Sequence, residues 1–168
     1  ARRSVSPVYR MGCILSETAV SISLHFINML ILLAYMKYIL RLELTSSYVE
    51  MLPAVIIGSM IGVTMGMFIT SIGKMGEGVK TGIMIGVSMV MSFLAGLMNA
   101  DVKNAVDRNV PLLNRINPAA LISDALYCLN VYDAPERYMQ DIVILSVMCV
   151  LLLTGTFLIV RRERYGSI

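Results

Sequence analysis

The chain has 168 residues, of which 57% are apolar and only 15% are charged, and its mean hydropathy is +0.76. A soluble domain has roughly 25% charged residues, so this chain offers too little polar surface for one compact soluble domain. Intrinsic disorder is excluded because it requires low hydrophobicity. A net charge of +3 is too small for a nucleic-acid-binding surface. The composition therefore indicates an integral membrane protein.

Four long stretches of the chain contain no Asp, Glu, Lys or Arg. Each has between 19 and 23 residues: 18–36, 51–73, 81–100 and 142–160. Roughly 20 apolar residues in a helix cross a hydrocarbon core of about 30 Å. Lipid offers the backbone no hydrogen-bond partner, so the segments should be helical, and they lack the alternation of barrel strands. We predict an all-α fold, a polytopic membrane helical bundle of four transmembrane helices, at 17–40, 51–73, 79–99 and 141–160.

The distribution of basic residues predicts the orientation of this single transmembrane domain. Four spans place both ends of the chain on one side, which carries eight Lys and Arg residues and a net charge of +5. The other side carries six such residues and a net charge of −2. Basic residues favour the cytoplasm, so we predict cytoplasmic segments at 1–16 and 161–168 and an external loop with short helices at 100–140. The absence of an initiator Met predicts a piece of a longer protein.

The external loop contains the signature of a short amphipathic helix. Asn117 is a good helix cap, and Pro118 is a good first helical residue. Apolar residues then recur at helical spacing: Leu121, Ile122, Ala125, Leu126 and Leu129. A helix of about 13 residues is too short to cross the bilayer. A re-entrant position and a position on the membrane surface fit it equally well.

Glycines repeat every four residues in the second and third predicted spans. They are Gly58, Gly62 and Gly66, followed by Gly78, Gly82 and Gly86. Small residues at this spacing share one helix face and allow another helix to approach closely. We predict helix packing there, either within the chain or with another subunit. Glycine is also commoner in membrane helices than in soluble ones, which is the alternative explanation.

The sequence contains no recognisable motif for catalysis or for metal binding. There is no phosphate-binding loop, no metal-ligand motif and no pair of catalytic residues within a span, so an intramembrane enzyme is disfavoured. Cys13, Cys128 and Cys149 form no CxxC and are interpreted as small apolar residues. The single His25 is interpreted as a packed residue. We predict no metal site and no cofactor bound by this chain.

Two stretches resemble a known family of membrane proteins. The opening RRSVSPVYRMGCILSE resembles an intracellular loop with a short coupling helix, and MVMSFLAGLMN with NVPLLNRINPAALISDALYCLNVYD resembles a helix end followed by external re-entrant helices. The positions that match are Ser92, Phe93, Gly96, Leu112, Ile116, Asn117 and Pro118. The family is the permease subunit of ATP-binding-cassette exporters with six helices per subunit, which includes the G subfamily. The chain resembles a C-terminal fragment with the third to sixth helices of that subunit.

The resemblance implies a membrane permease that exports a drug, lipid or peptide-like solute from a cell, with a bacterial source expected. ATP and Mg²⁺ would bind to a partner ATPase subunit or domain. The implied coupling residues are Ser6, Pro7, Tyr9 and Arg10, and the implied transport-path residues are Ser88, Ser92, Phe93 and Asn99. The resemblance also implies a second permease copy, in a homodimer or heterodimer, and contact with membrane lipid.

Another class of function is compatible with the same features. A membrane scaffold or assembly protein without a solute path would also use glycine faces for helix packing. Polar side chains such as Ser88 and Ser92 usually bond to a neighbouring helix or to their own backbone. A partner with a phosphate-binding loop would favour the exporter.

Overall fold

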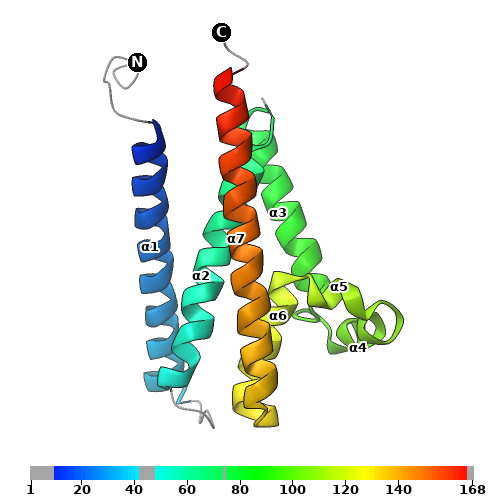
Figure 1. Cartoon of the computed structure of the whole chain (residues 1–168). Coiled ribbons are helices and arrows are strands. Elements are labelled where there is room, and N and C mark those ends of the chain that lie inside the picture. Colours follow the sequence, from blue (N-terminus) through cyan, green and yellow to red (C-terminus); the bar gives the residue numbers. More distant parts are fainter. Residues whose placement is uncertain (1–9, 42–47, 74, 166–168) are drawn as a thin grey trace.

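The computed structural model describes residues 10–41, 48–73 and 75–165, and every regular element in these ranges is a helix (Figure 1). The elements in chain order are α1 (Arg10–Tyr38), α2 (Tyr48–Ser71), α3 (Glu77–Leu94), α4 (Ala100–Asn109), α5 (Pro111–Arg115), α6 (Pro118–Tyr127), the π-helix η2 (Cys128–Tyr132) and α7 (Pro135–Tyr165). By length and composition, α1, α2, α3 and α7 can each cross a membrane. The predicted all-α bundle with four spanning helices is confirmed.

The long helices begin and end at different residues from the predicted apolar segments. Helix α7 begins at Pro135 instead of residue 141, and α2 begins at Tyr48 instead of residue 51. In both helices the first turn carries an acidic residue, Glu136 or Glu50. The positive end of the helix dipole stabilises such a residue, so the helix extends past the uncharged segment. Absence of charge is therefore a poor guide to where a helix starts.

The buried core lies where α2, α6 and α7 meet. One cluster of buried side chains contains Ala54 of α2, Ala125 of α6, Cys128 of η2 and Tyr138 of α7. A second cluster contains Ile61, Leu121, Leu145 and Cys149. Leu145 is fully buried, with no exposed surface. Because α6 contributes to both clusters, it is packed inside the bundle and does not lie apart on its surface.

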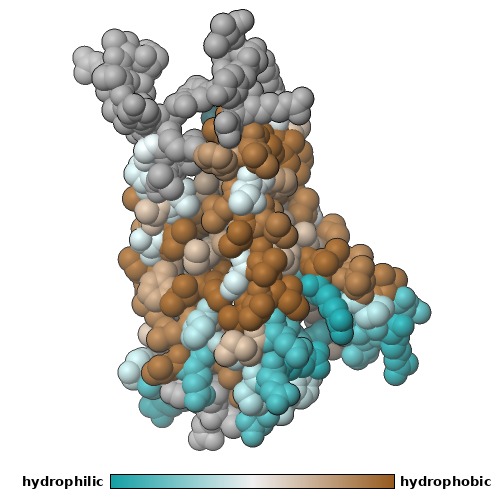
Figure 2. Space-filling view, in the orientation of Figure 1, coloured by the Kyte–Doolittle hydropathy of each residue, from teal (hydrophilic) through white to brown (hydrophobic). Residues whose placement is uncertain are grey.

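Helices α1 and α3 lie at the periphery of this core. No residue between Ser16 and Tyr38 of α1 is buried, and α3, all of which is described, contains no buried residue. The prediction that His25 is packed against other residues is wrong, because His25 is exposed on α1. Figure 2 shows an apolar surface along the long helices and a hydrophilic surface at one end. This apolar outer surface is what lipid would cover.

The bundle has two distinct ends. The start of α1 and the end of α7 lie at one end of the bundle (Figure 1). At the other end lie α4, α5, η2 and the start of α7, with α4 and α5 projecting sideways from the end of α3. We call this second end the loop end. The hydrophilic surface of Figure 2 lies at the loop end.

The glycines predicted to pack differ in their surroundings. A Cβ added to Gly58 would lie 3.5 Å from the Ile122 side chain of α6, and one on Gly66 would lie 2.7 Å from Met84 Cε of α3. Added at Gly62 or at the three glycines of α3, a Cβ would meet nothing within 4 Å. Gly58 and Gly66 therefore face helices of the same chain. The glycine face of α3 is open in the single chain.

A glycine outside both repeats makes a tight contact between α2 and α7. A Cβ on Gly155 would lie only 2.9 Å from Cε2 of Phe68. We expect Gly155→Ala to lower the free energy of unfolding by about 1 kcal/mol, because the aromatic ring must move. Thermal unfolding in detergent micelles measures this effect. The matched control is Gly62→Ala, where the space is open and alanine's better helix propensity should raise stability by about 0.5 kcal/mol. Equal shifts for both variants would contradict the prediction.

Candidate functional site: a polar cavity at the loop end

A cavity of about 530 Å³ opens between α4, α5, α6 and the start of α7. Its lining combines charged and amide side chains with a few apolar ones. The polar residues in its wall are Lys103, Asp107, Asn114, Arg115, Asp124, Arg137, Gln140 and Asp141. We call this space the polar cavity. Its walls come from four helices, so it exists only when α4 and α5 fold back against α6 and α7.

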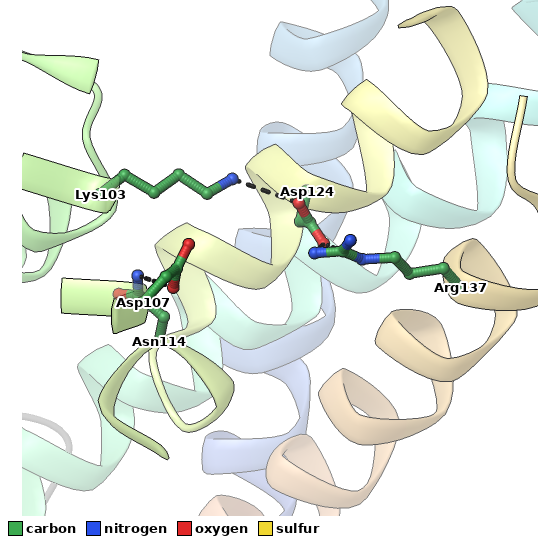
Figure 3. A network of polar contacts seen from close by, with 5 residues as sticks. All are labelled: Lys103, Asp107, Asn114, Asp124 and Arg137. Carbon is green, nitrogen blue, oxygen red and sulfur yellow. Dashed lines mark hydrogen bonds and ion pairs between the residues drawn. The ribbon is translucent and has the colours of Figure 1, made fainter. Parts of the chain in front are cut away.

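Asp124 is the centre of an ion network in the wall of the polar cavity (Figure 3). Its Oδ1 lies 3.2 Å from Nζ of Lys103, and its Oδ2 lies 2.8 Å from Nη2 of Arg137. Nε of Arg137 also donates to Oδ2 at 2.8 Å. The Asp124 side chain is only 12% exposed, whereas that of Arg137 is 60% exposed. One largely buried carboxylate on α6 therefore ties α4 to α7.

Two further acceptors near this network are buried without a hydrogen-bond partner among the described residues. They are Oδ2 of Asp141 and Oδ1 of Asn114. Nδ2 of Asn114 donates to Oδ1 of Asp107 at 2.7 Å (Figure 3). Buried polar atoms are nearly always paired. An unpaired acceptor beside a cavity is available to a water molecule, a donor group or a cation.

A thiol lies next to the same carboxylates. Cys128 is completely buried, and its Sγ lies within 4.8 Å of carboxylate oxygens of both Asp124 and Asp141. Burial and the negative charge of Asp124 raise the pKa of the Cys128 thiol above its usual value. The thiol therefore carries its proton at neutral pH when nothing is bound. Cys128 also begins the π-helix η2, a wide turn that is common at functional sites.

The side chain of Asn117 connects the start of α6 to α3. Its Oδ1 accepts a hydrogen bond from the backbone N–H of Ala119 at 3.0 Å, as predicted for a helix cap. Its Nδ2 donates to the backbone oxygen of Met91 at 2.8 Å. Asn117 is only 4% exposed. One side chain therefore starts α6 and holds it against the last turn of α3.

Comparison with protein families places these features in a known context. Residues 1–158 match the ABC-2 family transporter protein family. The chain belongs to the ABC-2 transporter family. No curated protein and no solved structure matches it. The family membership and the four apolar helices together make this ABC-2 protein a multi-pass membrane protein and the transport component of an ABC transporter, which is not itself catalytic.

Of the four residues that the resemblance implied for coupling, the structure describes only Arg10. Ser6, Pro7 and Tyr9 fall outside the described residues of the ABC-2 protein. Arg10 is the first residue of α1. Helix α1 begins at the end of the bundle where α7 finishes, so Arg10 lies at the end opposite the polar cavity (Figure 1).

The residues implied for a transport path lie along α3 and just after it. Ser88 and Phe93 are exposed, and Ser92 is half-buried. Asn99 follows α3, and its side chain accepts a hydrogen bond from the backbone N–H of Asp101 at 2.9 Å. Asn99 therefore caps α4. Phe93 shares the open glycine face of α3 with Gly82 and Gly86, whereas Ser88 is exposed on another side of the helix.

The sequence of the ABC-2 protein did not reveal the polar cavity. Its central residues are spread from position 103 to 141, and no motif has their spacing. The nearest signal was local, because Asp124 and Cys128 are four residues apart and therefore share a helix face. The carboxylate of Asp141, whose Oδ2 is buried, joins the group only through the packing of α7 against α6.

Proposed function

We propose that this chain is the membrane-spanning part of a permease that exports a solute, driven by a partner ATPase. The observation that carries the proposal is the family match over residues 1–158, combined with four helices able to span the membrane. ABC-2 permeases normally work with an ATP-binding subunit. ATP and Mg²⁺ are bound by that partner. The solute is a drug, a lipid or a peptide-like molecule.

We further propose that the four long helices correspond to the third to sixth helices of a six-helix subunit of the G-subfamily type. The chain is then the C-terminal part of that subunit, in a bacterial cell membrane. The start of α1 and the end of α7 face the cytoplasm, in agreement with the excess of basic residues there. The polar cavity then faces the outside of the cell.

The open face of α3 is the proposed wall of the transport path. A span of 18 residues with no buried residue requires either lipid or a partner against its open face. Gly82, Gly86 and Phe93 share this face, whereas Ser88 lies on another side of the helix. In a dimer, homomeric or heteromeric, two such faces would enclose a central cavity. An ATP-driven change in the spacing of the two subunits opens it alternately to each side.

The coupling segment provides the test of this proposal. In the full-length permease reconstituted with its ATPase in lipid vesicles, we expect the double variant Tyr9→Ala, Arg10→Ala to lose most solute transport while ATP hydrolysis continues. The physical reason is that the segment transmits the motion of the ATPase to α1. When the segment loses its contact with the ATPase, ATP hydrolysis no longer moves the helices. Transport and phosphate release are measured in the same vesicles.

A matched double variant controls for nonspecific damage. Tyr132→Ala with Arg108→Ala removes the same residue types from exposed positions at the loop end, and it should retain coupled transport. Unchanged coupling in the Tyr9 and Arg10 variant would overturn the assignment of that segment. An ATPase rate that never responds to any solute, together with no transport by the unaltered protein, would favour the membrane scaffold instead.

A further inference from the structure

We propose that Asp124, Cys128 and Asp141 form a binding site for a divalent transition-metal ion, with Zn²⁺ as the ion of best fit. The proposal rests on the fold alone and is independent of the transport proposal. The two carboxylates and the thiol offer ligand atoms that all lie within 4.8 Å of one another. Asp124 and Asp141 also line the polar cavity, which gives an ion and one water molecule access.

The buried carboxylate of Asp141 is the independent observation that points to a ligand. Asp141 is only 6% exposed, and its Oδ2 has no hydrogen-bond partner among the described residues. An ionised carboxylate in such a place costs several kcal/mol unless it is paired or coordinates a metal. A metal ion at the centre of the three ligands would satisfy this oxygen directly.

The ligand geometry is close to what zinc requires. Tetrahedral zinc has bond lengths of about 2.0–2.3 Å, which places neighbouring ligand atoms about 3.5 Å apart. The ligand atoms lie within 4.8 Å of one another, so no pair must approach by more than about 1.3 Å. Asp124 and Cys128 lie one turn apart, and the wide turn of η2 begins at Cys128. Only small adjustments of side chains are needed.

The type of ligand selects the ion. A thiolate favours Zn²⁺ and similar borderline or soft ions, whereas Ca²⁺ and Mg²⁺ require six or more oxygen ligands. On binding, the Cys128 Sγ gives up its proton to water, and the sulfur bonds to the metal as a thiolate. Three protein ligands leave a fourth position for water from the cavity.

Lys103 explains how the site remains stable without metal. Its ammonium lies 3.2 Å from Asp124 Oδ1, and also 5.8 Å from the centre of the Tyr127 ring. When a metal binds, Lys103 is able to leave Asp124 and remain over the aromatic ring, where a cation is attracted. The three anionic ligands are then balanced by the two charges of the metal and the one charge of Arg137. Lys103 therefore neutralises part of the negative charge of Asp124 when no metal is bound.

A cadmium titration tests the site without any need for transport. The full-length protein is purified in detergent micelles, treated with a chelator and titrated with cadmium chloride while the ultraviolet absorption of cadmium–thiolate bonds is recorded. We expect saturation at one ion per chain. Zinc should displace the cadmium, whereas an excess of magnesium or calcium should not.

Four variants test whether the cadmium signal comes from the proposed site. Cys128→Ser should abolish the absorption, while the matched control Cys149→Ser, which removes another buried cysteine, should retain it. Asp141→Asn should weaken binding by at least about tenfold, the scale seen when even an outer partner of a metal ligand is lost. Lys103→Met should tighten binding severalfold, because the competing ammonium is removed.

Defined results would overturn the metal site. They are the absence of a saturable signal in the unaltered protein, a signal that survives Cys128→Ser, and displacement of cadmium by calcium as readily as by zinc. If Cys128→Ser fails to fold, Asp141→Asn and Lys103→Met decide the question, because the proposal requires them to shift the affinity in opposite directions. None of these results depends on the identity of the transported solute.

Discussion

Truncating Leu145 to alanine is expected to lower the free energy of unfolding by about 2–4 kcal/mol. Leu145 has no exposed surface and packs with Ile61 of α2 and Leu121 of α6. In a membrane the loss comes from the missing dispersion contacts and the cavity left behind. Denaturant unfolding in detergent micelles, followed by circular dichroism, measures the change.

Leu151 provides the matched control on the same helix. Its side chain is 65% exposed on the outer surface of α7. We expect Leu151→Ala to change the free energy of unfolding by no more than about 0.5 kcal/mol, because lipid or detergent fills the space in both proteins. Similar losses for the two leucine variants would mean that α2, α6 and α7 do not share the core described above.

Replacing Asn117 with alanine is expected to lower the free energy of unfolding by about 2 kcal/mol. The lost cap of α6 accounts for about 1 kcal/mol, and the lost hydrogen bond to the Met91 backbone oxygen accounts for about another 1 kcal/mol. Thermal or denaturant unfolding measures the sum. Asn117→Ser should lose only about half as much, because a serine oxygen still caps the helix and no longer reaches α3.

The variant Asn99→Ala separates the capping effect of Asn117 from the effect of its hydrogen bond to α3. It also caps a helix, but it is exposed, and α4 lies outside the core. We expect Asn99→Ala to cost about 1 kcal/mol or less. If Asn99→Ala proves as costly as Asn117→Ala, then the bond between α6 and α3 contributes nothing to stability.

The start of α6 shows what local sequence signals predict well. Asn117 followed by Pro118 indicated a helix start, and the structure places the cap and the first helical residue at these positions. Capping depends on the hydrogen bonds and backbone angles of neighbouring residues, so a few letters of sequence contain the needed information. The position of α6 inside the bundle was not predictable in the same way, because an apolar stripe fits a membrane surface and a protein core equally well.

The glycines show that spacing in the sequence does not predict which of them contact another helix. All six predicted glycines share the same four-residue repeat, but only Gly58 and Gly66 face another helix of this chain. Gly155, outside any repeat, makes the tight contact with Phe68. Spacing determines which residues share a helix face. The crossing of one helix against another decides which part of that face is covered.

The sequence by itself determined that this chain is helical and has four segments able to span a membrane, because the exclusion of charge from lipid acts on each segment independently. Only the tertiary structure brought Lys103, Asp124, Arg137 and Asp141 together around one cavity, with the buried Cys128 beside the two carboxylates. These residues come from α4, α6, η2 and α7. Their contacts depend on how helices far apart in sequence pack and rotate against one another, and no local pattern specifies that geometry.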